Sequence, residues 1–326
     1  MICQSVCYEI DKNNRVCYYV SKGVENMFKK NDTVCFLGDS ITTHGYFIKE
    51  VFEYLAKNHK EDRVKLFNCG CPSEAEVRTV YRLHEDCLIF NPQKVVLMLG
   101  VNDIEPELYL PEIDADDKKK AALDLYKIKI RELVEKCEQF GAEVILCTPT
   151  PVQEERAIYK GCNEALGICI DFLKELAEEK DLLFVDYNTT LSQMFDREIM
   201  GADGIHPVEY GHHIMAQILL KTLGYIKECD FDTMPEYSDK NIERTKVETK
   251  LRHIRMMEWF AMYDFNMENP DATYEEKIKR AEEIREEAVK NQKQWLVNTA
   301  EDYINYFHRV PYLQGELLRK TIEMYE

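Results

Sequence analysis

The chain has 326 residues, of which 45% are hydrophobic and 31% are charged, a balance typical of a folded globular protein. Its formal net charge of −18 argues against nucleic acid or an anionic membrane as a main partner, because both are themselves negatively charged. The sequence also has no apolar run long enough to cross a bilayer. We therefore expect neither a nucleic-acid partner nor a membrane partner.

The 12 cysteines bear on the compartment and on metal binding. Residues 1–30 lack the basic start and the long apolar stretch of a signal peptide, so we expect a cytoplasmic protein whose thiols stay reduced. Cys69 and Cys71 could begin a metal site, but no second Cys/His pair with suitable spacing accompanies them. We therefore expect no metal site.

In chain order, residues 1–32 contain an Asp-Lys-Asn-Asn turn signal between two β-like runs, which predicts a β-hairpin. Five short, nearly continuous apolar runs then predict strands at 33–37, 64–67, 94–99, 143–147 and 182–185. Helix-length segments lie between them at 46–58, 76–90, 117–140 and 158–180, and a last helix should follow Pro207. This alternation predicts a doubly wound α/β domain over residues 33–228, with a parallel five-stranded sheet.

Residues 229–326 have a different character. Val247, Leu251 and Ile254 fall at helical spacing, and Thr273 with Glu276 forms a capping box that begins another helix. We expect an α-helical C-terminal extension whose apolar faces are covered in one of three ways. They pack on the α/β body, they pair in a homo-oligomer, or they form a lid over the active site.

Two candidate residues follow predicted strands at the sheet edge where α/β proteins bind ligands. Ser40 ends a Gly-Asp-Ser segment directly after the first strand, where a serine either caps a helix or acts as a nucleophile. Asn102, within Gly-Val-Asn-Asp, follows the third strand, and its amide either closes a turn or donates to an anion beside Ser40.

Two further segments fall at loops of the same predicted edge. Residues 68–73, Asn-Cys-Gly-Cys-Pro-Ser, follow the second strand and are able to point backbone N–H groups into it. Asp203 and His206 stand three residues apart before the last helix, a spacing that lets the carboxylate orient the imidazole. Each segment alone is ambiguous, but the four together predict a nucleophile, two donors and a base around one site.

These four segments resemble the blocks of the SGNH hydrolase superfamily, also called GDSL-like lipase/acylhydrolases, over roughly residues 33–225. The resemblance implies a three-layer flavodoxin-like fold, ester hydrolysis without a cofactor and a shallow active site. It implies Ser40, His206 and Asp203 as catalytic residues. It also implies an oxyanion hole made by the Ser40 N–H, a loop N–H and the Asn102 side chain.

The second block departs from the family pattern at one position. The family usually has a glycine five residues after the block's asparagine, whereas this chain has Ser73 there and Gly70 earlier in the loop. We expect the Ser73 N–H to be the second oxyanion donor, with Gly70 as the alternative. Gly70 and His44 are also candidates to line the substrate. His212 and His213, beyond the fourth block, are expected to be structural or exposed.

The expected function is a serine esterase or acylhydrolase that works through an acyl-enzyme. Family analogy favours short acyl groups, chiefly acetyl, on a small-molecule or carbohydrate ester. Two alternatives stay open: a thioesterase or lysophospholipase of the same fold, and a catalytically silent binding or assembly protein.

Overall fold

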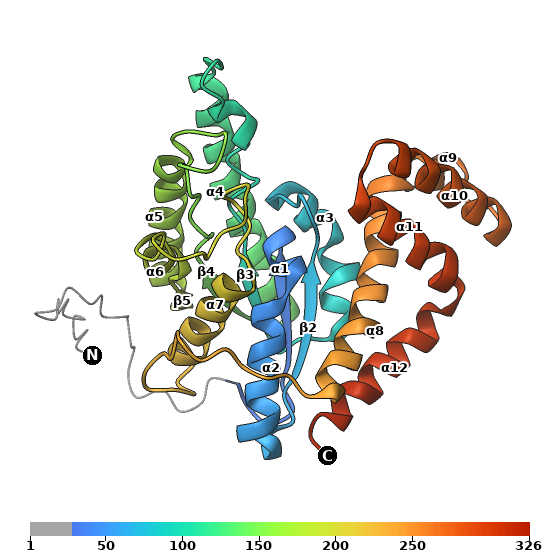
Figure 1. Ribbon diagram of the computed structural model, residues 1–326, viewed down its shortest axis with the longest axis horizontal. Helices are drawn as coiled ribbons and strands as arrows, with labels where there is room; N and C mark the ends of the chain where they lie inside the picture. Colours follow the sequence, from blue (N-terminus) through green and yellow to red (C-terminus); the bar gives the residue numbers. More distant parts are fainter. Residues whose placement is uncertain (1–27) are drawn as a thin grey trace, which may run out of the picture. The chain divides into compact units, whose positions relative to one another are not determined.

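The computed structural model describes residues 28–326, so the turn signal of the expected N-terminal hairpin lies outside the described residues. The chain divides into two compact units, Met1–Glu236 and Tyr237–Glu326. The first unit holds a parallel sheet of five strands in the order β2-β1-β3-β4-β5 (Figure 1). The strands are β1 (Thr33–Gly38), β2 (Lys65–Gly70), β3 (Lys94–Met98), β4 (Glu143–Cys147) and β5 (Leu183–Val185).

Helices cover both faces of this sheet, which confirms the predicted three-layer, doubly wound fold of the flavodoxin-like type. One layer contains α1 (Ser40–His44), α2 (Tyr46–Asn58), α6 (Tyr187–Ser192) and α7 (Glu209–Thr222). The other contains α3 (Glu76–Asp86), α4 (Asp116–Phe140) and α5 (Cys162–Lys180). Short 3₁₀ turns lie at Lys60–Asp62, Leu88–Phe90 and Pro106–Tyr109.

The strands are apolar because both of their faces are covered. All six residues of β1 are buried, and so are all five of β3. The register pairs Gly38 of β1 with Gly70 of β2, so these two strands end side by side. The loops that follow them therefore leave the sheet at one edge, where Ser40 and Ser73 stand.

Two predicted helices begin or end more than one residue away from their bounds in the structure. The helix expected at 158–180 begins at Cys162, because the Glu154 carboxylate accepts the Gly161 and Asn163 N–H groups at 3.0 and 2.9 Å and caps this end. Gly161 has a φ of 84°, which a helix does not contain. The helix expected at 76–90 is α3 followed by the 3₁₀ turn Leu88–Phe90.

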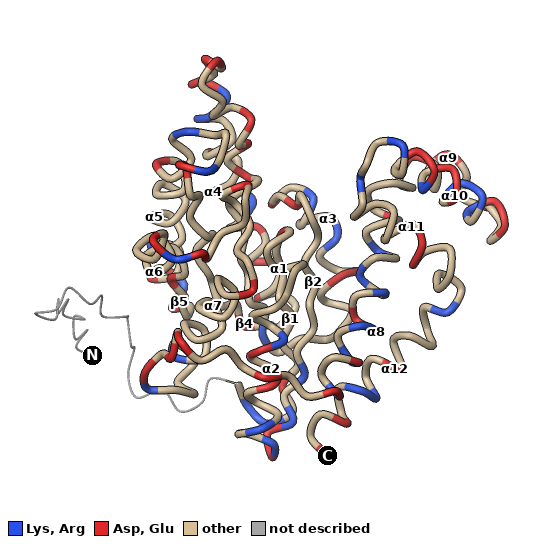
Figure 2. Tube along the Cα trace, in the orientation of Figure 1, with Lys and Arg blue, Asp and Glu red and all other residues tan. Residues whose placement is uncertain are grey.

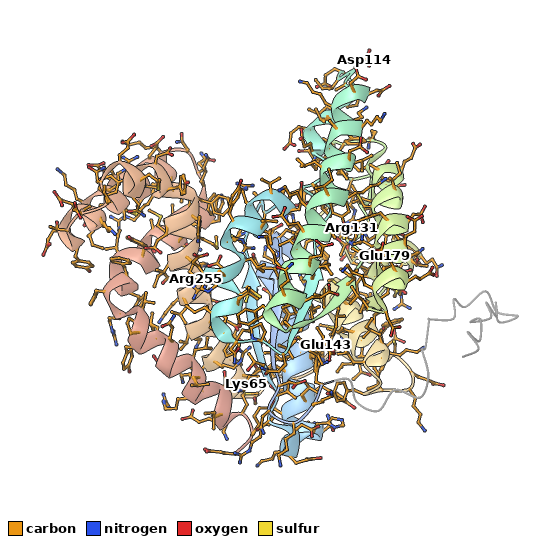
Figure 3. The ribbon with its side chains drawn as sticks, turned by 180° about the vertical axis from the view of Figure 1, so that it is seen from behind. Lys65, Asp114, Arg131, Glu143, Glu179 and Arg255 are labelled. Atoms are coloured by element: carbon orange, nitrogen blue, oxygen red, sulfur yellow. The ribbon has the colours of Figure 1, made fainter. Side chains whose placement is uncertain are left out.

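In the layer that contains α3, α4 and α5, an ion pair between Arg131 and Glu179 joins α4 to α5; both residues are labelled in Figure 3. Their two parallel hydrogen bonds measure 2.6 and 2.8 Å. Since both side chains are partly exposed, the pair adds little stability.

The second unit is helical, as expected for the C-terminal extension. It contains α8 (Asp239–Met256), a π-helical turn (Met257–Ala261), α9 (Tyr263–Glu268), α10 (Tyr274–Lys290), α11 (Gln294–Tyr306), a 3₁₀ turn (Phe307–Arg309) and α12 (Val310–Glu323). Helix α8 packs against α11 and α12, and α10 packs against α11. Figure 2 shows acidic and basic residues interspersed along α10.

The predicted capping box begins α10. The Thr273 hydroxyl accepts the Glu276 N–H at 3.3 Å, and the Glu276 carboxylate accepts the Thr273 N–H at 2.7 Å. Within residues 28–326, no helix combines the length and apolar character needed to span a bilayer.

Candidate active site

Ser40 is the first residue of α1, two positions after the end of β1. Asp39 caps this helix by accepting the Ile41 N–H at 2.9 Å, and its burial raises the pKa of its carboxyl to about 6. As a first-turn residue, Ser40 has a backbone N–H with no partner inside the helix. The residue is only partly buried.

His206 and Asp203 extend a hydrogen-bonded chain from Ser40. The Ser40 Oγ lies 2.8 Å from His206 Nε2, and His206 Nδ1 lies 2.6 Å from Asp203 Oδ2. The loop that carries them is closed by the Gly201 N–H, which donates to the His206 carbonyl at 2.8 Å. The structure thus brings together a hydroxyl, an imidazole and a carboxylate from distant parts of the sequence.

The Asp203 carboxylate decides which imidazole nitrogen carries the proton. Partial burial by itself raises the pKa of Asp203, but hydrogen bonds from Ile205 N–H, the His206 ring and His206 N–H together hold this pKa below its ordinary value. An ionised carboxylate only accepts hydrogen bonds, so His206 Nδ1 is the donor. In the neutral imidazole, Nε2 is then free to accept the Ser40 proton.

The loop after β2 contains both candidates for the second oxyanion donor. The Gly70 N–H is already bonded to the Asn68 side-chain oxygen at 2.9 Å. The Ser73 N–H makes no hydrogen bond within the described part of the chain. Ser73 adopts a φ of 54°, a left-handed conformation that a non-glycine residue rarely takes.

Gly70 has a packing role instead, because β2 and α1 meet closely there. A Cβ added at Gly70 would lie 2.4 Å from the Thr43 nitrogen. The position therefore requires glycine, for a reason separate from any contact with substrate.

Asn102 and Asp103 follow β3 and bind the segment just after Ser73. Asn102 Nδ2 donates to the Glu74 carbonyl at 2.8 Å, which leaves its second N–H available. Asp103 accepts the Glu76 N–H at 2.9 Å, and burial raises the pKa of its carboxyl well above the ordinary range. Sequence reasoning missed Glu74, and with it Arg82, because neither matches a family block.

His44 is exposed and lies next to His206, with the two ring centroids 5.4 Å apart. His212, beneath them on α7, is fully buried and stacks on the Phe47 ring at 5.7 Å. Burial, with smaller effects from His44 and His206, lowers the pKa of His212 to about 3. Of the two environments expected for His212, structural and exposed, the structure shows the buried, structural one.

His213 is also buried and joins α7 to α2 through an ion pair. Its Nδ1 lies 2.9 Å from a Glu50 carboxylate oxygen, and its Nε2 lies 2.9 Å from the Asp230 carbonyl. Both partners are acceptors, so both ring nitrogens carry hydrogen and the ring is an imidazolium. Burial alone would lower the pKa of His213, but the Glu50 carboxylate and the Asp230 carbonyl raise it overall.

This raised pKa predicts a pH-dependent contribution to stability. A group whose pKa is raised on folding stabilises fully below its unfolded value and loses that stabilisation as pH rises through the folded value. We expect His213→Gln to cost about 3–5 kcal/mol at acidic pH. The cost should shrink progressively above about pH 6.5. Urea unfolding of both proteins across this range measures it.

The exposed His84 supplies the control, since His84→Gln changes the same side chain without a buried partner. Its effect on unfolding free energy should stay small at every pH. A His213→Gln cost that grows with pH would contradict the ion-pair assignment.

Three cysteines lie close together in the core. The sulfur atoms of Cys35, Cys69 and Cys87 are all within 4.8 Å of one another, and Cys71 is not among them. Burial raises the pKa of Cys35 well above its ordinary value, and the neighbouring thiols raise it further.

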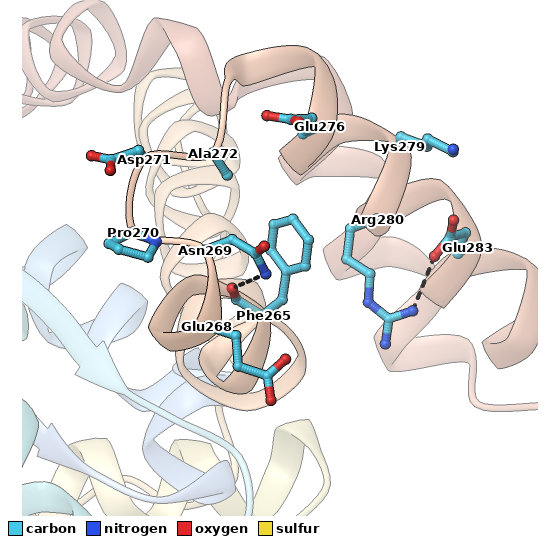
Figure 4. A pocket seen from close by; sticks show the side chains of 10 residues that line it. All are labelled: Phe265, Glu268, Asn269, Pro270, Asp271, Ala272, Glu276, Lys279, Arg280 and Glu283. Carbon is cyan, nitrogen blue, oxygen red and sulfur yellow. Dashed lines mark hydrogen bonds and ion pairs between the residues drawn. The ribbon is translucent and has the colours of Figure 1, made fainter.

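A surface pocket of about 520 Å³ lies in the helical unit, between the end of α9 and the start of α10 (Figure 4). Its lining carries charges of both signs, and Arg280 is paired with Glu283 at 3.1 Å. Asn269 donates to the Phe265 carbonyl at 2.9 Å. None of its lining residues is a serine, cysteine or histidine, so it holds no pairing of a hydroxyl or thiol with an imidazole.

Comparison with known proteins gives a family and several relatives. The profile of the GDSL-like Lipase/Acylhydrolase family matches residues 36–214. An acetylxylan esterase from Geobacillus stearothermophilus is 26% identical over 214 residues, which cover 60% of this chain and 94% of that protein. A solved structure of this kind of enzyme from that organism, a catalytic mutant of Axe2, has a TM-score of 0.54 at 23% identity and covers 61% of this chain and 97% of its own.

A second solved structure matches both units. BT4096, a gut microbial diltiazem-metabolizing enzyme, has a TM-score of 0.75 at 16% identity and covers 93% of this chain and 96% of its own. The helical unit is therefore part of a fold that another protein shares.

Proposed function

The chain belongs to the GDSL-like lipase/acylhydrolase family, which makes it an ester hydrolase, and we propose that it is a serine esterase that cleaves short carboxylic esters through an acyl-enzyme. The observation that carries the proposal is the chain of hydrogen bonds from Ser40 through His206 to Asp203. Axe2 offers a parallel, because catalytic mutants of it have alanine in place of a serine, an aspartate or a histidine.

In the proposed mechanism, Ser40 Oγ attacks the ester carbonyl while His206 Nε2 takes its proton. The Asp203 carboxylate stabilises the imidazolium that forms. His206 then gives the proton to the leaving alcohol, and an acyl group remains on Ser40. A water molecule, deprotonated by His206, attacks this acyl-enzyme; the bond to Ser40 Oγ breaks, the acid leaves, and His206 returns the proton to Ser40 Oγ.

The developing oxyanion needs donors that are in place before the reaction. We assign the Ser40 N–H, the Ser73 N–H and the second Asn102 side-chain N–H to this role. The assignment favours Ser73 over Gly70, because the Gly70 N–H is already bonded to Asn68.

Asn102→Ala is expected to lower kcat by about 10²–10³-fold with a smaller change in KM, because an oxyanion donor acts mainly in the transition state. Steady-state kinetics on p-nitrophenyl acetate measures the change. Asn188→Ala is the matched control. Its amide donates to the Pro149 carbonyl at 3.2 Å, and it likewise follows a strand of the same sheet. Equal losses in the two variants would mean that Asn102 acts only by holding the loop.

For the substrate, we propose acetyl esters, including those of carbohydrates, on the analogy of the acetylxylan esterase relative. A panel of p-nitrophenyl acetate, butyrate, octanoate and palmitate, with acetylated xylo-oligosaccharides alongside, tests this. Highest kcat/KM on acetate supports the proposal. A preference for long acyl chains supports a lysophospholipase, and a preference for acyl thioesters supports a thioesterase.

The decisive test of class is covalent labelling with a fluorophosphonate, which reacts with activated serines. We expect labelling of the wild-type protein and none of Ser40→Ala. A wild-type protein that neither labels nor hydrolyses any ester of the panel would be a binding or assembly protein that retains the fold.

We also propose a cytoplasmic location. The cysteines among residues 28–326 are free thiols, eight of them buried, and a reducing compartment keeps such residues in this state.

A further inference from the structure

Arg82, on α3, is a charged side chain in the interior of the first unit. Its side chain is 2% exposed. Its Nε donates to the Glu74 carboxylate at 2.7 Å, and its Nη1 donates to the Asp86 carboxylate at 2.9 Å. A buried guanidinium is retained in a folded protein only when its charge and its N–H groups are paired, and here two carboxylates pair it.

The same guanidinium also binds the ends of two neighbouring strands. Its Nη1 donates to the Cys69 carbonyl of β2 at 3.0 Å, and its Nη2 donates to the Gly38 carbonyl of β1 at 3.3 Å. Gly38 lies two residues before Ser40. Arg82 therefore connects the strand that leads to the nucleophile with the strand that leads to the Ser73 loop.

Glu74, directly after Ser73, is held at both of its polar ends. The Asn102 side chain binds its carbonyl at 2.8 Å, and Arg82 binds its carboxylate. The Arg78 guanidinium also donates to the Ser73 carbonyl. Ser73 has a φ of 54°, and a non-glycine residue keeps such a conformation only where its surroundings impose it.

We propose that Arg82, through Glu74, is a positioning residue that holds the Ser73 N–H in the geometry of the oxyanion hole. This inference rests on the proposed esterase function. It adds an explanation of how the Ser73 N–H, the oxyanion donor that departs from the family pattern, is held in place. The position suits arginine because its planar fork reaches several acceptors at once, whereas a lysine ammonium is a point charge.

Arg82→Lys is the first test, because it keeps the positive charge and loses the fork. We expect kcat to fall by about 10²-fold, the size of effect that a misplaced catalytic group produces. KM should change by less than about threefold. Methyl trifluoromethyl ketone corresponds to the acetyl group, and its adduct with the serine mimics the tetrahedral intermediate. The affinity for this ketone should fall by about the same factor as kcat.

A suppressor separates positioning from general stability. Glycine adopts a positive φ without being held there, so Ser73→Gly in the Arg82→Lys background should recover at least about tenfold in kcat. The recovery is measured relative to Ser73→Gly in the native background, which reports the effect of this substitution by itself. A purely structural role for Arg82 would lower the melting temperature without this recovery.

Arg244 in the helical unit provides a matched control. It is likewise a buried arginine, 1% exposed, with a carboxylate four residues later: its Nη1 lies 3.1 Å from Glu248 Oε1. Arg244→Lys should lower the melting temperature and leave kcat unchanged.

Glu74→Gln keeps an oxygen that can accept from Arg82 and serves if Arg82→Lys does not fold. It should lower kcat by about tenfold in the same pattern, since the charge-assisted bond becomes neutral. A folded Arg82→Lys protein with native kcat would overturn the proposal. If Arg82→Lys does not fold, a folded Glu74→Gln protein with native kcat would overturn it instead. Wild-type turnover is measured first. A wild-type protein that is inactive on every ester contradicts the esterase function itself. An active wild-type protein with unaffected variants contradicts only the positioning role of Arg82.

Discussion

Ser40→Ala should lower kcat by on the order of 10⁶-fold, or about 8 kcal/mol in the barrier to acyl transfer. The reason is that the proposed nucleophile, the Ser40 hydroxyl, lies 2.8 Å from His206 Nε2, which can accept its proton as the hydroxyl attacks the ester. KM should change little, since the removed oxygen takes part mainly in bond formation. Pre-steady-state kinetics with p-nitrophenyl acetate in excess should show no burst of p-nitrophenol.

Ser192→Ala is the control for this prediction. Ser192 is an exposed serine on α6 whose hydroxyl donates to the Asn188 carbonyl at 2.8 Å. It should keep native turnover and native fluorophosphonate labelling. If Ser40→Ala retained more than about one hundredth of wild-type turnover, the nucleophile would have to be another residue.

Asp203→Asn should lower kcat by about 10⁴-fold while the fold stays intact. An asparagine oxygen can still accept the Ile205 and His206 N–H groups that Asp203 Oδ1 accepts now, at 2.9 and 3.1 Å. Its NH₂ group would then face His206 Nδ1, and two donors cannot bond to each other. The imidazole would therefore take the other tautomer, with its proton on Nε2, where it cannot accept from Ser40.

The matched control is Asp186→Asn. Asp186 also follows a strand of the sheet, and it caps α6 by accepting the Thr189 N–H at 3.0 Å, but it does not touch His206. Asparagine caps a helix about as well as aspartate, so this variant should keep both its stability and its kcat. Comparable kcat losses in both aspartate variants would show that charge near the edge matters, rather than the orientation of His206.

The fold could be predicted from the sequence because local pattern and tertiary structure agree over most of the first unit. The run at 143–147 is apolar on both faces and corresponds to β4 with the same bounds. The segment at 46–58 corresponds to α2, whose start is marked by Gly45 at a φ of 66°. The predicted start of α5 at residue 158 was wrong. The Glu154 side chain caps this helix from several residues upstream, and no periodic pattern encodes such a contact.

Only part of the candidate site could be predicted from local sequence patterns. The pairing of Ser40 with His206 was predictable because both follow or precede elements that meet at one sheet edge, and their catalytic roles stay predictions. The adjacent residues His212 and His213 differ in environment: among residues 28–326, His212 has no hydrogen-bond partner, whereas His213 is paired with Glu50 of the neighbouring helix α2. Arg82 lies on an amphipathic helix, where a charged residue ordinarily faces solvent. Its acceptors include the carbonyls at the ends of β1 and β2 and the Glu74 carboxylate, which no helical pattern reveals.

The separation of Ser40 from His206 by 166 residues has a consequence for how the protein acquires its activity. Their meeting closes a loop that contains every strand of the sheet after β1, and loops of this length form late because their closure costs the most chain entropy. A serine with no imidazole beside it is a poor nucleophile. The rate at which Ser40 becomes open to covalent modification during refolding therefore reports when the final α/β crossover forms. This measurement is independent of spectroscopic signals that report secondary structure.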